Sequence, residues 1–298
     1  MLNWLRAFRE RGWQEIDAAL YAQIWRRFGG SVATHPLVIE QLADLAEIPA
    51  RYLGWRINDD WQAAIPTWGR YLALDKRVLK QRGKKGLFDL GNAEIILPVA
   101  PEARIALRHH ARYLSELHTS NIVTAKAQRE QLALSRAPED FSSKFRYNQR
   151  RERRLAEAAG GEIRPASDFS PAEFAALYLE LFQRRWGFAA TGKAHMAEVF
   201  SRLSPLLTGA ALFINGSPVA VQVLYRAESP EWISIEYING GVDPESRDFS
   251  PGSVLSCANT QMAWEAARAL GKPLRYSFGR ADRDYKRVWC HPHPVLRV

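Results

Sequence analysis

The chain has 298 residues, of which 47% are hydrophobic, and it carries a formal net charge of +9. This length and composition suffice for two domains with their own cores, and they exclude a disordered chain. Its two cysteines, Cys257 and Cys290, provide neither a disulfide framework nor a metal-binding spacing, which fits a reducing cytoplasm. We read His291 and His293 as part of a solvated tail, so no metal site is expected.

The chain begins with aromatic and aliphatic residues set among arginines: Trp4, Leu5, Phe8 and Trp13 with Arg6, Arg9 and Arg11. The segment lacks the ordered basic, apolar and small-residue regions of a signal peptide, so we expect the protein to stay inside the cell. Such a segment suits a position at the surface of an anionic membrane. An ordinary helix that packs its apolar side on the domain is the alternative.

The rest of the first half is predicted to contain a helix, a hairpin, two further strands and a second helix. An amphipathic helix should run from about Gln14 to Phe28 and end at Gly29 and Gly30. The other predicted elements are a hairpin over 51–71, strands near Leu87–Phe88 and Ile95–Val99, and a helix over Glu102–Leu117.

The second half opens with a basic helix, Phe141 to Ala159, and a capping box at 170–173 begins another helix. The stretch from Leu203 to Tyr225 has no charge, but prolines and the Asn215–Gly216 pair interrupt it. We therefore predict a β-hairpin there and no membrane span.

The stretch from 232 to 286 is the most informative part of the sequence. A strand over Trp232–Ile238 leads to a helix that begins at Ser250-Pro251-Gly252-Ser253, and a strand over Leu274–Phe278 follows. Proline fits the first helical turn, and small neighbours allow an anion to approach the exposed amides. The helix is predicted to bury one face, made of Leu255, Ala258, Met262, Ala266 and Ala269.

This order of motifs resembles the C-terminal half of the FemAB and CelD-like branch of the GNAT acyltransferases. The shared pattern is R-x-x-x-P-G, a long helix, a strand, and then G-R-x-x-x-x-Y-K, and the basic segment 141–151 extends it upstream. Over its full length, including the tryptophan-rich start, the chain most resembles the Mig-14 family of bacterial antimicrobial-peptide resistance proteins.

The resemblance implies an α/β fold made of two tandem GNAT-like units, each a mainly antiparallel mixed sheet flanked by helices. We expect a degenerate N-terminal unit at 1–135 and a C-terminal acyltransferase unit at 136–298. The boundary fits Ala137–Pro138, which breaks the pattern, and the first half has no Ser-Pro-Gly helix start that could hold a donor.

By the same resemblance, the donor is acyl-CoA or aminoacyl-tRNA, with its phosphates held at Ser250, Gly252 and Ser253 and countered by Arg247. Backbone N–H groups of 237–240 would stabilise the oxyanion. Tyr285 occupies the matched Tyr-Lys position as the acid or base, with Lys286 beside it as a possible contact for an anion.

Glu236 is a second catalytic candidate, because a carboxylate inside an otherwise apolar strand is costly unless it is paired or functional. Its alternation with Ile235 and Tyr237 favours a plain, outward-facing carboxylate.

Basic residues gather in two clusters, with six in the ten residues of 76–85 and six in the eleven residues of 144–154. Solvated faces, anionic lipid, nucleic acid and donor phosphates are all open interpretations. Sequence-specific DNA binding is not expected, because no second short helix lies at recognition-helix spacing. Binding of tRNA stays open, since a basic groove along a backbone needs no motif.

The family resemblance implies a contribution to resistance against cationic antimicrobial peptides. We expect a protein peripherally attached to the cytoplasmic side of the inner membrane, acting through modification of an envelope component. The alternative is a catalytically inactive GNAT-like scaffold or binding protein at the membrane surface.

Overall fold

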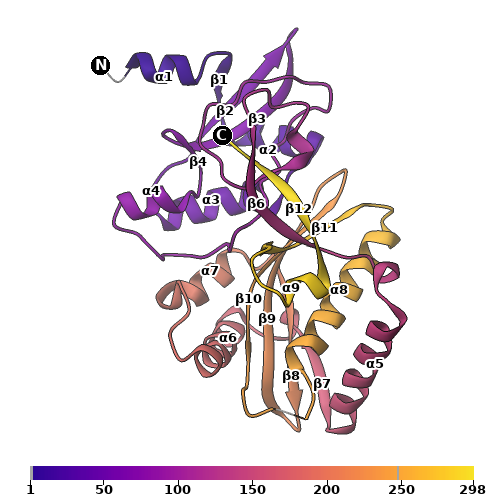
Figure 1. Cartoon of the computed structure of the whole chain (residues 1–298). Helices are drawn as coiled ribbons and strands as arrows, with labels where there is room; N and C mark the ends of the chain where they lie inside the picture. Colours follow the sequence, from indigo (N-terminus) through magenta and orange to yellow (C-terminus); the bar gives the residue numbers. More distant parts are fainter. Residues whose placement is uncertain (1–2, 247) are drawn as a thin grey trace.

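The computed structural model describes residues 3–246 and 248–298, and the chain forms two β-sheets flanked by helices (Figure 1). The smaller sheet is antiparallel and keeps the order of the sequence: β1 (Trp13–Ile16), β2 (Arg51–Ile57), β3 (Asp60–Trp68) and β4 (Tyr71–Leu72). It contains the hairpin predicted over 51–71. The turn of that hairpin is tight, with Asn58 and Asp59 at positive φ.

The larger sheet has eight strands in the order β5-β12-β6-β11-β10-β9-β8-β7. Within the described part of the chain, β10 and β11 form the one parallel pair of strands in this sheet, and the other strand pairs are antiparallel. The strands are β5 (Leu114–Ser115), β6 (Lys126–Ser135), β7 (Gly161–Pro165), β8 (Leu207–Ile214), β9 (Ser217–Glu228), β10 (Ile233–Val242), β11 (Leu274–Arg280) and β12 (Cys290–Arg297).

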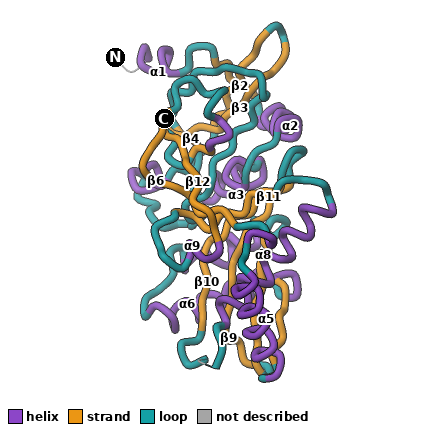
Figure 2. The backbone as a smooth tube through the Cα atoms, turned by 45° about the vertical axis from the view of Figure 1, so that its right-hand side comes forward, coloured by secondary structure: helices purple, strands orange, loops and turns teal. Residues whose placement is uncertain are grey.

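The α-helices are α1 (Asn3–Arg9), α2 (Ala18–Phe28), α3 (Pro36–Leu45), α4 (Lys76–Gln81), α5 (Ser143–Ala158), α6 (Pro171–Trp186), α7 (Met196–Arg202), α8 (Pro251–Ala269) and α9 (Lys286–Trp289). They lie on both faces of the larger sheet, and α2 and α3 pack on one face of the smaller sheet (Figures 1 and 2). The predicted capping box begins α6, where Ser170 and Glu173 bond each other's backbone amides.

The two faces of the larger sheet bury different helices. Alternate residues of β9, Val221 and Val223, pack with Phe174 of α6 and Phe200 of α7. On the other face, strand residues pack against Val254, Leu255, Ala263 and Ala267 of α8. Helix α8 therefore packs beside the parallel strands β10 and β11, and its first turn lies near the ends of these strands.

The two halves of the chain share a core. The cluster that contains Phe174 and Phe200 also contains Tyr21, Ile39 and Leu42 from α2 and α3. In addition, β6, which ends at Ser135, pairs with both β11 and β12. The division at 135/136 therefore stays a proposal about the origin of the two parts, whereas the predicted fold class, α/β with mainly antiparallel sheets and flanking helices, is confirmed.

Several predicted elements differ from the structure. No helix covers Glu102–Leu117, because the odd-numbered residues from Ala103 to Tyr113 are buried and most of the even-numbered ones are exposed, which is the period of extended chain. The segments Leu87–Phe88 and Ile95–Val99 do not form strands either. Within the second segment, Ile95 and Val99 each make a single isolated β-bridge.

One predicted helix begins later in the structure, and another buries a partly different face. The helix expected from Gln14 begins at Ala18, because Trp13–Ile16 pairs as β1 and the Asp17 side chain caps the helix. The predicted buried face of α8 was partly wrong: Leu255 is buried, but Met262 and Ala269 are exposed, while Asn259 and Thr260 are buried. The sequence of α8 does not indicate its buried face clearly, because the helix is rich in alanine, which occurs on both buried and exposed faces of helices.

Candidate active site

The parallel strands β10 and β11 part within the larger sheet. Their register runs from Ile233 opposite Leu274 to Glu236 opposite Ser277 and stops there, although both strands continue. Each strand is irregular beyond this point, with register shifts between Tyr237 and Asn239 in β10 and between Ser277 and Arg280 in β11. Backbone groups of β10 beyond Glu236 therefore have no partner strand on this side.

The first turn of α8 lies at the same opening. Gln222, a buried residue of β9, donates hydrogen bonds to the Gly252 carbonyl at 3.1 Å and to the Ser256 hydroxyl at 2.9 Å. Asn259 in turn donates to the Gln222 side-chain oxygen at 2.9 Å. This polar network fixes the helix start against the sheet, and Gln222 is a positioning residue that sequence reasoning missed.

The helix start offers one open amide. The Ser250 amide donates to a Glu152 carboxylate oxygen at 2.8 Å, and the Ser253 amide donates to the Ser250 carbonyl. Among the described residues, none accepts a hydrogen bond from the amide of Gly252. A carboxylate therefore already occupies part of this helix start, as the positive end of the helix dipole favours.

A cleft of about 760 Å³ joins the strand opening to the helix start. Four predicted site residues line it, namely Ser250, Gly252, Ser253 and Tyr285, together with 237–239 of β10. Gly91 and Asn92, from the first half, form part of its wall. The structure thus brings together groups that the sequence places up to 48 residues apart within the second half. Arg247 lies outside the described residues.

Tyr285 is half exposed, at 50%, and burial raises the pKa of its hydroxyl above the usual value, while the charge of Arg185 lowers it. Its hydroxyl is therefore protonated at neutral pH, which is the form that can donate a proton. Lys286 also lines the cleft, but its ammonium donates to the Arg280 carbonyl at 2.7 Å, and burial lowers its pKa. That bond ties the Tyr285 loop to the end of β11.

Two arginines without any local sequence signal also line the cleft, Arg185 at the end of α6 and Arg283 in the loop after β11. Trp186, which matches the FemAB-like pattern at the end of α6, lies beside them in the cleft wall. The Arg185 guanidinium lies 4.7 Å from the ring centroid of Trp186. With Lys286, these groups give the cleft wall a positive charge that a donor phosphate requires. Their convergence depends on tertiary structure, and no local pattern signals it.

Glu236 does not line the cleft. It is only 2% exposed, so the expectation of an outward-facing carboxylate was wrong. Its side chain accepts a hydrogen bond of 2.8 Å from the Glu94 amide, and the Glu94 carboxylate pairs with Arg275. At Glu236, β10 packs against residues of the first half. The face of the strand that the alternation of residues marks as exposed is therefore covered.

Burial, and next the charge of Glu94, raise the pKa of Glu236 well above its usual value of 4.5. Because the protonated form is favoured in the folded state, the stability that Glu236 contributes is fully present below about pH 4.5 and is lost as the pH rises through the raised pKa. We expect Glu236→Gln, which cannot ionise, to become more stable than the wild type as the pH rises.

The measurement is urea unfolding of both proteins at pH 5 and pH 9. A difference in free energy of unfolding that stays constant between the two pH values would contradict a protonated Glu236 in the folded chain.

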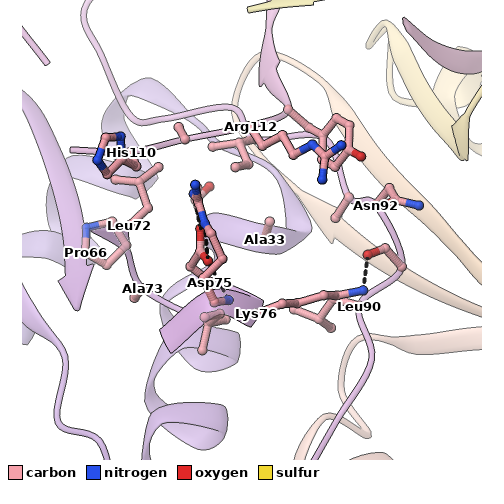
Figure 3. Close-up of a pocket in the computed structure, with 18 residues that line it drawn as sticks. Ala33, Pro66, Leu72, Ala73, Asp75, Lys76, Leu90, Asn92, His110 and Arg112 are labelled. Atoms are coloured by element: carbon pink, nitrogen blue, oxygen red, sulfur yellow. Dashed lines mark hydrogen bonds and ion pairs between the residues drawn. The ribbon is translucent and has the colours of Figure 1, made fainter. Parts of the chain in front are cut away.

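A separate cavity of about 220 Å³ lies in the first half (Figure 3). Its cations are engaged: Arg77 pairs with Asp75 at 2.6 Å, and Lys76 bonds Asp89 and the Gly91 carbonyl at 2.8 Å each. Its floor is apolar, with Leu72 and Leu90 among the lining residues. Gly91 and Asn92 line both this cavity and the cleft, so one segment separates the two.

A family model described as Mig-14 matches residues 35–298, most of the chain. The chain belongs to the Mig-14 family. No curated protein matches its sequence. Within the part that the structure describes, no group of three or more histidine, cysteine or acidic residues is arranged to hold a metal ion.

Among solved structures, this Mig-14 family member is similar to FemX, with a TM-score of 0.55 and 11% identity over 96% of both chains. It also matches L-PGS from Bacillus licheniformis, with a TM-score of 0.48 and 12% identity over 95% of this chain and 92% of that one. The third match is the C-terminal domain of a putative lysylphosphatidylglycerol synthetase from Agrobacterium fabrum, with a TM-score of 0.41 and 14% identity over 62% and 65% of the two chains. The likeness to FemX confirms the fold expected for the FemAB-like branch of the GNAT superfamily.

Proposed function

We propose that the chain is a GNAT-type transferase that moves an acyl or aminoacyl group from a phosphate-bearing donor to an envelope component. The observation that carries this proposal is the meeting, in one cleft, of the parted strands β10 and β11, the open amide of Gly252 and the hydroxyl of Tyr285. Each corresponds to a need of acyl transfer: a place for the carbonyl, a place for phosphate and a proton donor.

In this reaction the acceptor amine or hydroxyl attacks the donor's acyl carbon. A bond forms between the acceptor atom and that carbon, and the bond to the donor's sulfur or oxygen breaks. Backbone amides of 237–239, on the side where β10 has parted from β11, stabilise the oxyanion of the intermediate. Tyr285, protonated at neutral pH, supplies the proton that the departing sulfur or oxygen takes up. The acceptor's own proton leaves to water or to a second base.

The donor is proposed to be acyl-CoA or aminoacyl-tRNA, with its phosphates at the α8 start. Gly252 allows close approach there, and Arg185 and Arg283 supply positive charge. The acceptor is proposed to enter beside Gly91 and Asn92, which line the same cleft. For the biological role, we propose that the modified envelope component lowers the binding of cationic antimicrobial peptides, as the Mig-14 membership supports.

The test is a comparison of envelope extracts by mass spectrometry, from cells with the wild-type gene and with the gene deleted. We expect one envelope component to lose an acyl or aminoacyl mass in the deletion strain, together with greater sensitivity to cationic peptides. Identical extracts and unchanged sensitivity would contradict the proposal.

One observation favours a second candidate, a non-catalytic scaffold. The carboxylate of Glu152 already bonds the Ser250 amide at the helix start, where a donor phosphate would otherwise approach. A scaffold would keep this contact permanently, whereas a transferase must tolerate a phosphate beside it. Glu152→Gln separates the two, since it should strengthen donor binding in a transferase and leave a scaffold without donor binding.

We further propose peripheral attachment to the cytoplasmic side of the inner membrane through α1. Among the described residues, no helix has the length and apolar character needed to cross a membrane. The apolar side chains of α1 are nevertheless exposed, at 63% for Trp4 and 58% for Phe8. In Figure 1, α1 lies at the end of the molecule farthest from β7 and β8. Glu10 pairs with Arg6 and Arg9 and offsets part of their charge, so the exposed rings and the remaining positive charge act together in the attraction to an anionic surface.

Replacing Trp4 and Phe8 together by serine is expected to weaken binding to anionic vesicles at least about tenfold, because two aromatic side chains no longer leave water. The measurement is cosedimentation with phosphatidylglycerol vesicles, and Leu270→Ser, an exposed apolar residue at the end of α8, is the control. High salt should also release the wild-type protein. Equal binding by the double variant would exclude α1 as the attachment site.

A further inference from the structure

A groove of about 430 Å³ runs between α5 and α8, which lie side by side (Figure 1). It is separate from the acyl-transfer cleft, and Trp289 is the residue that lines both. Its volume falls within the range of about 300–1,000 Å³ typical of small-molecule sites. The proposed transfer reaction makes no use of this groove.

Aromatic and aliphatic side chains make up half of the residues that line the groove. Phe141 and Phe145 stack with ring centroids 4.6 Å apart, and the edge-on ring of Trp289 lies 5.1 Å from Phe145. Cys257 and Ala258 of α8 form the opposite wall. A narrow apolar groove between two helices suits an unbranched hydrocarbon chain, which gains free energy roughly in proportion to the apolar area it removes from water.

Two polar atoms of the groove lack partners. Neither the Gln149 side-chain oxygen nor the Trp264 indole nitrogen has a hydrogen-bond partner within the described part of the chain, although both atoms are buried. Leaving a buried polar atom unsatisfied costs about 1–3 kcal/mol. One atom is an acceptor and the other a donor, and both belong to residues that line the groove.

Four exposed arginines line the groove and form its rim, against one carboxylate, that of Glu265: Arg146, Arg150, Arg153 and Arg268. Arg153 pairs with Glu157 and Arg268 with Glu139. The guanidinium of Arg150 makes no ion pair with any described residue, so it is available to a ligand. A positive rim above an apolar groove complements an anionic headgroup joined to an acyl chain.

We propose that this groove binds an anionic membrane lipid, with one acyl chain between α5 and α8 and the phosphate at the arginine rim. The bound lipid lies behind Trp289, which forms the shared wall with the cleft, and it holds the second half of the chain at the membrane surface. Lipid binding here and acyl transfer in the cleft are independent, so either can fail alone.

The test uses Cys257 as a reporter within the groove. Of the two cysteines, Cys290 is only 2% exposed, so a maleimide should label Cys257 first. Burial raises the pKa of the Cys257 thiol, and labelling is therefore followed at alkaline pH. We expect lysophosphatidylglycerol, below the concentration at which it forms micelles, to slow labelling at least about tenfold. Calorimetric titration with the same lipid gives a second measure that does not depend on the thiol.

Lysophosphatidylcholine with the same acyl chain should protect Cys257 far less, because its headgroup has no net charge. Arg150→Ala should weaken lysophosphatidylglycerol binding about fivefold, the loss of one cation near an anionic group. Lys144→Ala, which removes an exposed cation of α5 outside the groove, is the matched control and should bind as the wild type does.

Three results would overturn the proposal: no protection and no heat of binding, equal protection by the two lipids, or unchanged affinity in Arg150→Ala. Protection by a single-stranded oligonucleotide in the absence of any protection by lipid would instead assign the groove to nucleic acid, and would overturn it equally.

Discussion

Tyr285→Phe is expected to lower the turnover of acyl transfer by about two to four orders of magnitude, the usual cost of losing a general acid. The substitution keeps the ring and removes only the hydroxyl, which burial holds in its protonated form at neutral pH. Donor binding should change little, because the phosphate contacts lie at α8. The fall should therefore appear in kcat rather than in KM.

Single-turnover kinetics with saturating donor provide the measurement. Tyr147→Phe is the control, since Tyr147 is a similarly exposed tyrosine on α5 that does not line the cleft. If Tyr285→Phe transfers as fast as the wild type, Tyr285 is not the acid, and its role reduces to packing in the loop after β11.

Gly252→Val is expected to weaken donor binding at least about tenfold, the equivalent of about 1.4 kcal/mol. A β-carbon at this position would already lie 3.3 Å from a methyl carbon of Val242, and a β-branched side chain extends further across the open amide. The added methyl groups keep a phosphate away from the helix start. This variant therefore tests the phosphate site independently of the proton donor.

Ala269→Val, at the exposed end of the same helix, controls for the lower helix propensity of valine. Thermal unfolding of both variants shows whether the helix survives. A Gly252→Val protein that folds and binds donor as tightly as the wild type would remove the helix start from the site.

Sequence patterns located the second half of the fold well, because its signals are local. The Asn215–Gly216 turn, the capping box at Ser170 and the proline at the start of α8 each act within a few residues. The extended segment from Ala103 to Tyr113 was misread as a helix, since it covers the smaller sheet and its burial depends on residues far away in the chain.

The residues of the candidate site also divide into those with a local sequence signal and those whose position depends on distant parts of the chain. Ser250, Gly252, Ser253 and Tyr285 were found from motifs, and the structure places them in one cleft. Sequence could not show that Glu236 faces Glu94 across the junction of the two halves, because alternation along a strand cannot tell a covered face from an exposed one. Nor could it show that Glu152 reaches the Ser250 amide across 98 residues of sequence.

The central claim is that the cleft between β10, β11 and the start of α8 holds a phosphate-bearing acyl donor. Calorimetric titration of the purified wild-type chain with acyl-CoA and, separately, with aminoacyl-tRNA tests it most directly. The account predicts saturable binding of one of these donors at one site per chain, weakened in Gly252→Val and retained in Tyr285→Phe. Absence of binding by both donors would contradict it.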